Sequence, residues 1–122
     1  MTGIAVRKIQ KVVWVTFQKV GYHKYPNAPA DVGYLANEHR HIFKFRASLS
    51  VATDNREIEF HQLLRELELL YGADHLRVDH KSCEMMAVEL HDYLVKAYPG
   101  RAVTVEVSED GECGSTVSSH PA

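Results

Sequence analysis

The sequence predicts an α+β domain in which an antiparallel, four-stranded sheet carries two helices on one face. Three stretches alternate between apolar and polar residues, which is typical of strands with one buried face, and a short fourth stretch follows them. Between the second and the third stretch, apolar residues recur at helical spacing in two segments. The expected order is therefore β-β-α-α-β-β, in a single domain over residues 1–122 whose tail from about residue 118 is flexible.

The first strand is predicted over residues 4–18 (IAVRKIQKVVWVTFQ), where β-branched and aromatic residues are frequent. Within it, Val13, Val15 and Phe17 alternate with polar residues. Residues 21–38 (GYHKYPNAPADVGYLANE) hold two prolines and two glycines, so we expect an irregular loop there, with His23 near its start. Connections of this length inside a small domain are usually functional or disordered.

The second strand is predicted over residues 39–52 and begins with two histidines, His39 and His41. Because side chains alternate along a strand, both imidazoles share the apolar face of Phe43 and Phe45. An imidazole at the rim of such a face loses water and needs a partner. Metal ligation and an ordinary polar strand end both remain open on this pattern.

Two helices are predicted next. The first covers residues 57–71, with an apolar stripe and Gly72 as its stop signal. Ser82 is a favourable N-cap for the second, which ends before Pro99 and Gly100. We expect a loop over residues 73–81 (ADHLRVDHK) between them.

The third strand, residues 102–109, places Glu109 on the same face as Val103, Val105 and Val107. A carboxylate on an apolar face is costly unless it is paired. Glu109 therefore meets a basic group, turns to solvent at the strand end, or binds a ligand. A turn and a last short strand follow within residues 111–119.

The composition narrows the classes of function. Apolar residues make up 45% of the chain, charged residues 25%, and the formal charge is −2, so we expect neither a nucleic-acid nor a membrane surface and favour a small-molecule partner. Since we find neither a signal-type segment nor a membrane-spanning one, the expected compartment is the cytoplasm. There Cys83 and Cys113, which form no CxxC motif, are expected to be free thiols.

His23, His39 and His41 are the candidate metal ligands. Three imidazoles with an open fourth position are the usual layout of a catalytic zinc site, provided that the loop folds back to bring His23 to the strand. Otherwise His23 is a solvated loop residue.

The loop before the second helix holds two Asp-His pairs, Asp74-His75 and Asp79-His80. Such a pair can act as a general base near neutral pH, but both can equally be exposed and without function. At the start of the helix, the helix dipole is a sufficient reason for Glu84. Cys83 either gains thiolate character from that dipole or is buried and inert.

Four segments, taken in order, resemble the family of 6-pyruvoyl-tetrahydropterin synthase and 6-carboxytetrahydropterin synthase. EHRHIFKFRASLSV is similar to its HGH-bearing second strand, REIEFHQLLREL to the segment leading into its first helix, SCEMMAVELHDYL to its PTxEN helix, and VTVEVSEDGECGSTV to its final hairpin. The resemblance covers nearly the whole chain. It implies a T-fold subunit assembled with copies of itself into a barrel-like ring, a trimer or hexamer, with sites between subunits.

The resemblance implies that His23, His39 and His41 bind Zn²⁺ and that Glu109 anchors a pterin ring, a task suited to a carboxylate that accepts two parallel hydrogen bonds. It places Glu84 among the substrate-binding residues and gives proton transfer to His80 with Asp79, or His75 with Asp74. Two departures stand out: Leu35 replaces the catalytic cysteine, and Arg40 replaces the glycine between the zinc ligands.

The expected function is a zinc-dependent lyase of pterin or 7-deazaguanine-precursor (queuosine) metabolism that acts on dihydroneopterin triphosphate or a relative. The alternative is a non-catalytic T-fold module that binds a purine, a pterin or a modified nucleotide. A structural oligomer with surface histidines is a third possibility.

Overall fold

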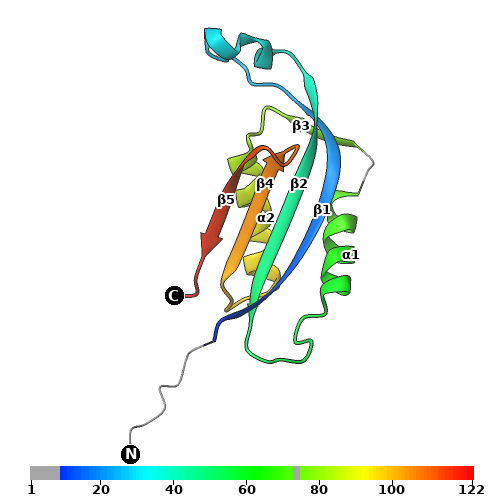
Figure 1. Cartoon of the computed structure of the whole chain (residues 1–122), viewed down its shortest axis with the longest axis vertical. Helices are drawn as coiled ribbons and strands as arrows, with labels where there is room; N and C mark the ends of the chain where they lie inside the picture. Colours follow the sequence, from blue (N-terminus) through cyan, green and yellow to red (C-terminus); the bar gives the residue numbers. More distant parts are fainter. Residues whose placement is uncertain (1–8, 73–74) are drawn as a thin grey trace, which may run out of the picture.

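The fold is built on a five-stranded mixed sheet with the strand order β3-β1-β2-β4-β5, as the computed structural model in Figure 1 shows. The structure describes residues 9–72 and 75–122. Neighbouring strands are antiparallel except β1 and β3, which are parallel. The α+β class is therefore confirmed, whereas the expected purely antiparallel sheet of four strands is wrong by one strand.

The two longest strands, β1 (Lys11–His23) and β2 (His39–Val51), pair in register over their whole length, from Lys11 opposite Val51 to His23 opposite His39. The first strand was predicted over residues 4–18, of which 4–8 lie outside the described residues. It runs five residues further than expected, to His23, because backbone pairing with β2 continues past Phe17, where the apolar alternation ends. His23 is therefore a strand residue and not a loop residue.

The predicted loops contain two further elements. The segment after β1 includes a 3₁₀-helix, η1 (Ala30–Ala36). The segment predicted as a loop over residues 73–81 contains β3 (His75–Asp79), which pairs with the end of β1. Val78, whose side chain is buried in the core, gives this edge strand its anchor.

The helices follow their capping signals. Helix α1 (Phe60–Tyr71) begins three residues later than predicted because the Glu59 carboxylate accepts the Gln62 N–H at 2.8 Å and caps it. It ends at Gly72, whose φ of 61° suits glycine. Helix α2 (Cys83–Ala97) begins, as predicted, after the N-cap Ser82. None of the helices in the described ranges is long and apolar enough to cross a membrane.

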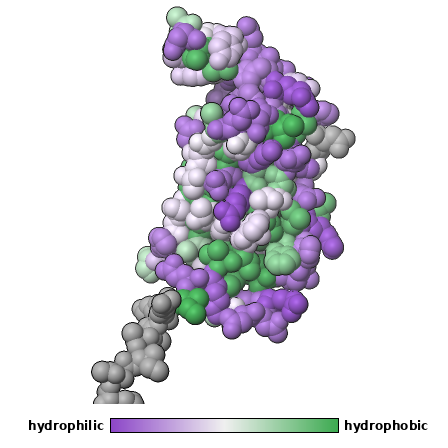
Figure 2. All heavy atoms as spheres, in the orientation of Figure 1, coloured by the Kyte–Doolittle hydropathy of each residue, from purple (hydrophilic) through white to green (hydrophobic). Residues whose placement is uncertain are grey.

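Both helices pack against one face of the sheet; in Figure 1, α2 lies behind the sheet and α1 beside β1. The final strands β4 (Val103–Glu109) and β5 (Cys113–Ser119) complete that sheet. The core between the helices and the sheet includes Phe43, Phe45, Leu49, Leu63, Leu67, Leu90, Leu94, Val103, Val105 and Val107. Figure 2 shows the molecule in the same orientation, with mixed hydrophilic and hydrophobic side chains. On the sheet's other face, Arg46 lies 4.7 Å above the ring of half-exposed Trp14. The apolar layer has a rim where the C-terminal ends of β1 and β4 flank the start of β2.

Candidate metal centre

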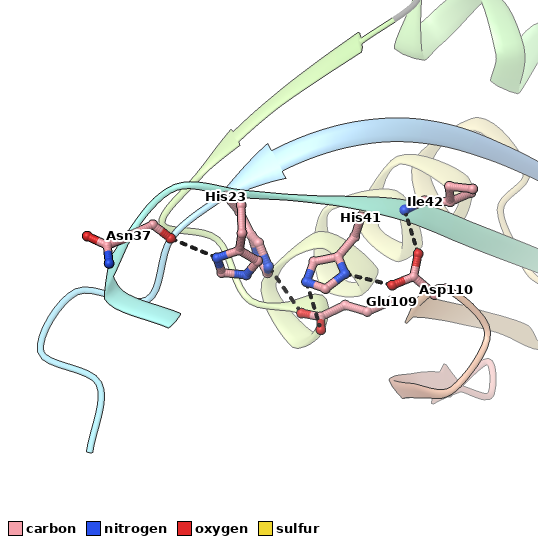
Figure 3. Close-up of polar contacts among 7 residues, drawn as sticks. His23, Asn37, His41, Ile42, Glu109 and Asp110 are labelled. Carbon is pink, nitrogen blue, oxygen red and sulfur yellow. Dashed lines mark hydrogen bonds and ion pairs between the residues drawn. The ribbon is translucent and has the colours of Figure 1, made fainter. Parts of the chain in front are cut away.

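Three histidines converge at that rim. The antiparallel register sets His23 opposite His39, and His41 follows two residues along β2, opposite Gly21. All three side chains therefore project from the same face, as Figure 3 shows for the two histidines that it labels, His23 and His41. One ring nitrogen from each lies within 4.8 Å of the other two. The predicted ligand set is thus brought together by strand pairing and needs no folded-back loop.

The Nε2 atoms of the three histidines are buried and have no hydrogen-bond partner in the part of the chain that the structure describes. A buried polar nitrogen without a partner costs free energy, and here three of them gather at one point. A metal ion supplies the missing partner for all three lone pairs at once. The donor set, three neutral imidazoles, is one that zinc accepts.

The opposite nitrogens of two of these rings are held by partners that fix the tautomer. The Nδ1–H of His39 donates to the Asn37 carbonyl at 2.8 Å. The Nδ1–H of His41 donates to the Asp110 carboxylate at 2.7 Å, and the same carboxylate accepts the Ile42 N–H at 2.8 Å (Figure 3). These bonds leave the Nε2 lone pairs free for a metal, as in known histidine metal sites.

The Asp110 carboxylate is held in its charged form. Its pKa is lowered, mainly by the hydrogen bond from the Ile42 N–H and next by that from His41. The pKa of His23 is also lowered, mainly by burial, although nearby Glu109 opposes the shift. A lowered pKa keeps the His23 imidazole neutral, which is the form that binds metals.

Glu109 lies beside the histidines at the end of β4, where it pairs with Phe43 of β2. Its Oε1 is 3.3 Å from Nε2 of His23, and its Oε2 is 3.4 Å from Nε2 of His41. Of the three environments that the strand pattern left open for this carboxylate, the structure thus shows basic groups as neighbours.

Phe43 separates the histidines from the apolar core. Its fully buried ring packs edge-on against His23 and His41, with ring centroids 5.2 and 5.9 Å apart. Gly21 leaves room for it, because a Cβ atom at this position would lie 2.7 Å from the Phe43 ring. Glycine at this point of β1 therefore allows the aromatic floor of the site.

A cleft of about 550 Å³ opens next to the centre. His23, His39 and Glu109 lie on its wall, and Leu35 of η1 and His80 face the same space. The start of α2 contributes Ser82, Cys83, Glu84 and Met85, and other lining residues include Lys24, Tyr25, Lys81, Cys113 and Gly114. The cleft thus joins two of the predicted metal ligands, His23 and His39, to two other predicted site residues, His80 and Glu84.

The Asp-His pairs have different places. His80 lines the cleft and has its Nδ1 3.4 Å from the Asp79 carboxylate, although both side chains are more than half exposed. His75, on β3, packs against Tyr22 of β1 and lines a separate hollow. Asp74 lies outside the described residues. The structure therefore places His80, from the Asp79-His80 pair, at the cleft, and His75 away from it.

The two thiols also reach the cleft. Cys113 is exposed, and Cys83 is buried. Burial, followed by the nearby Glu109 carboxylate, raises the pKa of the Cys83 thiol to about 11. Cys83 is therefore protonated at neutral pH, which agrees with the alternative in which it is buried and inert.

Sequence reasoning missed Asp110 and Asn37, the partners of the outer ring nitrogens. Asp110 and Gly111 form a turn in which both residues have positive φ, so turn propensity alone explains an Asp-Gly pair there. The one feature of the sequence that could have pointed to Asp110 is its position, directly after the inward-facing Glu109.

Comparison with models of known protein families and with curated proteins finds no match for this chain. The geometry of the histidine cluster therefore carries the functional argument.

Proposed function

We propose that the chain is a zinc-dependent carbon-oxygen lyase of the 6-pyruvoyl-tetrahydropterin synthase type, acting on dihydroneopterin triphosphate or a related compound. The observation that carries the proposal is the set of three buried Nε2 atoms that lack a hydrogen-bond partner among the described residues, on histidines whose ligand atoms lie within 4.8 Å of one another. Two of these histidines, His23 and His39, line a cleft. Three imidazole ligands with a fourth position facing a cleft are typical of catalytic zinc.

The cleft has the properties that such a substrate needs. Its volume of about 550 Å³ is within the range of small-molecule sites. The N-terminal end of α2 provides N–H groups for a polyphosphate chain. Lys24 and Lys81 also line the cleft, and in this proposal they exchange their present partners, Asp79 and Glu89, for the phosphates. In this proposal the Glu109 carboxylate accepts hydrogen bonds from the 2-amino and ring N–H groups of the pterin.

Proton transfer is assigned to His80, the imidazole of the cleft outside the metal cluster, with Asp79 as its partner. When bound, Zn²⁺ supplies a Lewis acid for the hydroxyl groups of the substrate side chain. Phe43 closes the floor beneath the histidines and excludes water from the core side of the site.

The architecture is compatible with the T-fold that the proposal requires. Strands β1, β2, β4 and β5 form an antiparallel four-stranded unit with α1 and α2 on one face, and β3 is an addition at its edge. We include in the proposal a ring of identical subunits, since the outer edges of β3 and β5 leave backbone groups for pairing between copies.

Zinc analysis of the purified protein tests whether the three histidines bind the metal. Wild type should bind one equivalent of zinc and His39→Ala should lose it. His61→Ala, which removes an exposed histidine of α1, is the matched control and should keep the metal. A full equivalent of zinc in His39→Ala would show that the ligand assignment is wrong.

A second candidate function is a binding module without chemistry. The observation that favours it is Leu35, an apolar side chain in the cleft at the place of the catalytic cysteine in the resembled family. Incubation of zinc-loaded protein with dihydroneopterin triphosphate separates the two functions. Product formation supports the lyase, whereas thermal stabilisation by the compound without turnover supports the binding module.

A further inference from the structure

We infer that Glu109 is itself a zinc ligand in the substrate-free protein, so that the centre is a closed His₃Glu set which the substrate must open. The inference rests on the proposed zinc site and adds a role to Glu109. It depends on where the two carboxylate oxygens lie relative to the imidazoles.

The distances from Glu109 to two of the imidazoles match those within a zinc site. In a tetrahedral zinc site with bonds of about 2.0–2.1 Å, neighbouring ligand atoms lie about 3.3 Å apart. The oxygens of Glu109 lie 3.3 Å from Nε2 of His23 and 3.4 Å from Nε2 of His41. Hydrogen bonds from N–H to oxygen are usually about 2.7–3.2 Å long, and among the described residues these two nitrogens make none. For these two pairs of atoms, the spacing matches that of neighbouring ligands on one ion.

The charge of Glu109 has no cationic partner. Within the described ranges, its carboxylate lies close to the imidazoles of His23 and His41 and forms no ion pair with a lysine or arginine. Neutral imidazoles do not compensate a carboxylate, and three of them leave the full double charge on a zinc ion. A bound carboxylate lowers the charge of the centre to about +1, which makes a partly buried site less costly for both groups.

Glu109 is also the member of the centre that is easiest to reach from solvent. The three histidines form the group of mutually close ligand atoms, and the carboxylate approaches this group at His23 and His41. Its side chain is 32% exposed, against 10% for His23 and 19% for His41. Glu109 is thus the more accessible ligand and the one that an entering molecule can remove.

A consequence follows for substrate binding. The carboxylate cannot hold zinc and grip a pterin ring with the same oxygens. Binding of the ring therefore draws Glu109 from the metal and opens a coordination position for the side-chain hydroxyls. Ring recognition and exposure of the metal become one event, and a compound without the ring leaves the centre closed.

The test compares wild type with Glu109→Gln and with Glu106→Gln, a matched control. Glu106 is on the same strand but faces the other side of the sheet, next to Arg46. Zinc affinity is measured by competition with a chromophoric chelator. We expect Glu109→Gln to weaken it at least ten- to a hundred-fold, since even loss of an outer partner has an effect of about that size. Glu106→Gln should match wild type.

The absorption spectrum of the Co²⁺-loaded protein gives a second readout. It should differ between wild type and Glu109→Gln, and pterin should change it in wild type. If Glu109→Gln folds poorly, Glu109→Asp, which withdraws the carboxylate by one methylene group, should show the same loss of affinity. Wild-type zinc affinity together with a wild-type Co²⁺ spectrum in a folded Glu109 variant would overturn the inference.

The outcome for Glu109 is separable from that of the proposed zinc site. Zinc binding that His39→Ala abolishes and Glu109→Gln leaves unchanged removes the ligand role of Glu109 alone. Failure of wild type to bind zinc removes both.

Discussion

Asp110 is expected to control the metal affinity of His41 without touching the metal. One carboxylate oxygen accepts the Nδ1–H of His41 at 2.7 Å, and the other accepts the Ile42 N–H at 2.8 Å. Asp110→Asn keeps the shape and can keep the bond to the backbone. The amide NH₂ group of the new asparagine then points toward the Nδ1–H of His41, so that two hydrogen-bond donors face each other.

The ring responds by moving its proton. His41 can accept from the amide only when Nδ1 is unprotonated, and the neutral ring then carries its proton on Nε2, the nitrogen that faces the centre. A metal must displace this proton before it binds. Loss of such an outer partner typically weakens affinity ten- to a hundred-fold, or about 1.4–2.7 kcal/mol.

Zinc competition with a chelator measures this loss at pH 7. The matched control is Asp92→Asn, because Asp92 pairs with His91 in the same way, 3.1 Å from its Nδ1, but outside the metal cluster. Asp92→Asn should bind zinc as wild type does. Equal zinc affinities for Asp110→Asn and wild type would refute the argument that Asp110 fixes the His41 tautomer.

Three further predictions concern stability and assembly. Gly21→Ala should lower the free energy of unfolding by roughly 1–3 kcal/mol in urea titrations, because the new Cβ would lie 2.7 Å from the Phe43 ring; wild-type stability would show that the floor is not tightly packed. Hydrogen bonding to Arg101 lowers the pKa of Glu57 from 4.5 to about 2, so its stabilisation is complete above pH 4.5 and is lost as pH falls toward 2. Glu57→Gln should therefore flatten the acid limb of a plot of melting temperature against pH, and an unchanged limb would contradict this. Light scattering should give a mass of several subunits, and a monomer mass at micromolar concentration would count against the ring.

Much of the sheet could be predicted because one face is buried. Where a strand has that property, alternation fixes which residues point inward, as it did for Phe43 to Leu49 and for Val103 to Val107. The same rule placed His39, His41 and Glu109 on the inner face, and the structure gathers them there. The inner-facing members of the site were thus accessible from local pattern.

Two features depended on pairing between distant segments. His23 lies in β1 because the backbone of residues 21–23 pairs with β2, although GYH has no apolar alternation. Strand β3 has only Leu76 and Val78 as apolar residues, too few to establish a period, and it is fixed by parallel pairing with the end of β1. Hydrogen bonding between strands overrode the local loop signals in both cases.

The outer partners of the histidines could not be predicted for a different reason. Asp110 has a sufficient explanation as a turn residue, and its bond to His41 spans 69 positions in the sequence. Asn37 contributes a backbone carbonyl, which carries no residue-type signal. Such contacts become visible only when the register of β2 and β4 is known.

The choice between a lyase and a binding module reduces to the source of a proton-transfer group in the cleft. Leu35 cannot supply one, and the Cys83 thiol, with its pKa raised to about 11 by burial, is a poor base at neutral pH. If Glu109 is held by the metal until the ring arrives and then holds the ring, it is occupied in both states. His80 is the imidazole that lines the cleft outside the metal cluster, and its Nδ1 lies 3.4 Å from the Asp79 carboxylate. The chemistry of the proposed lyase therefore depends on this exposed pair approaching the substrate, whereas zinc and ring binding depend on the three clustered histidines and Glu109.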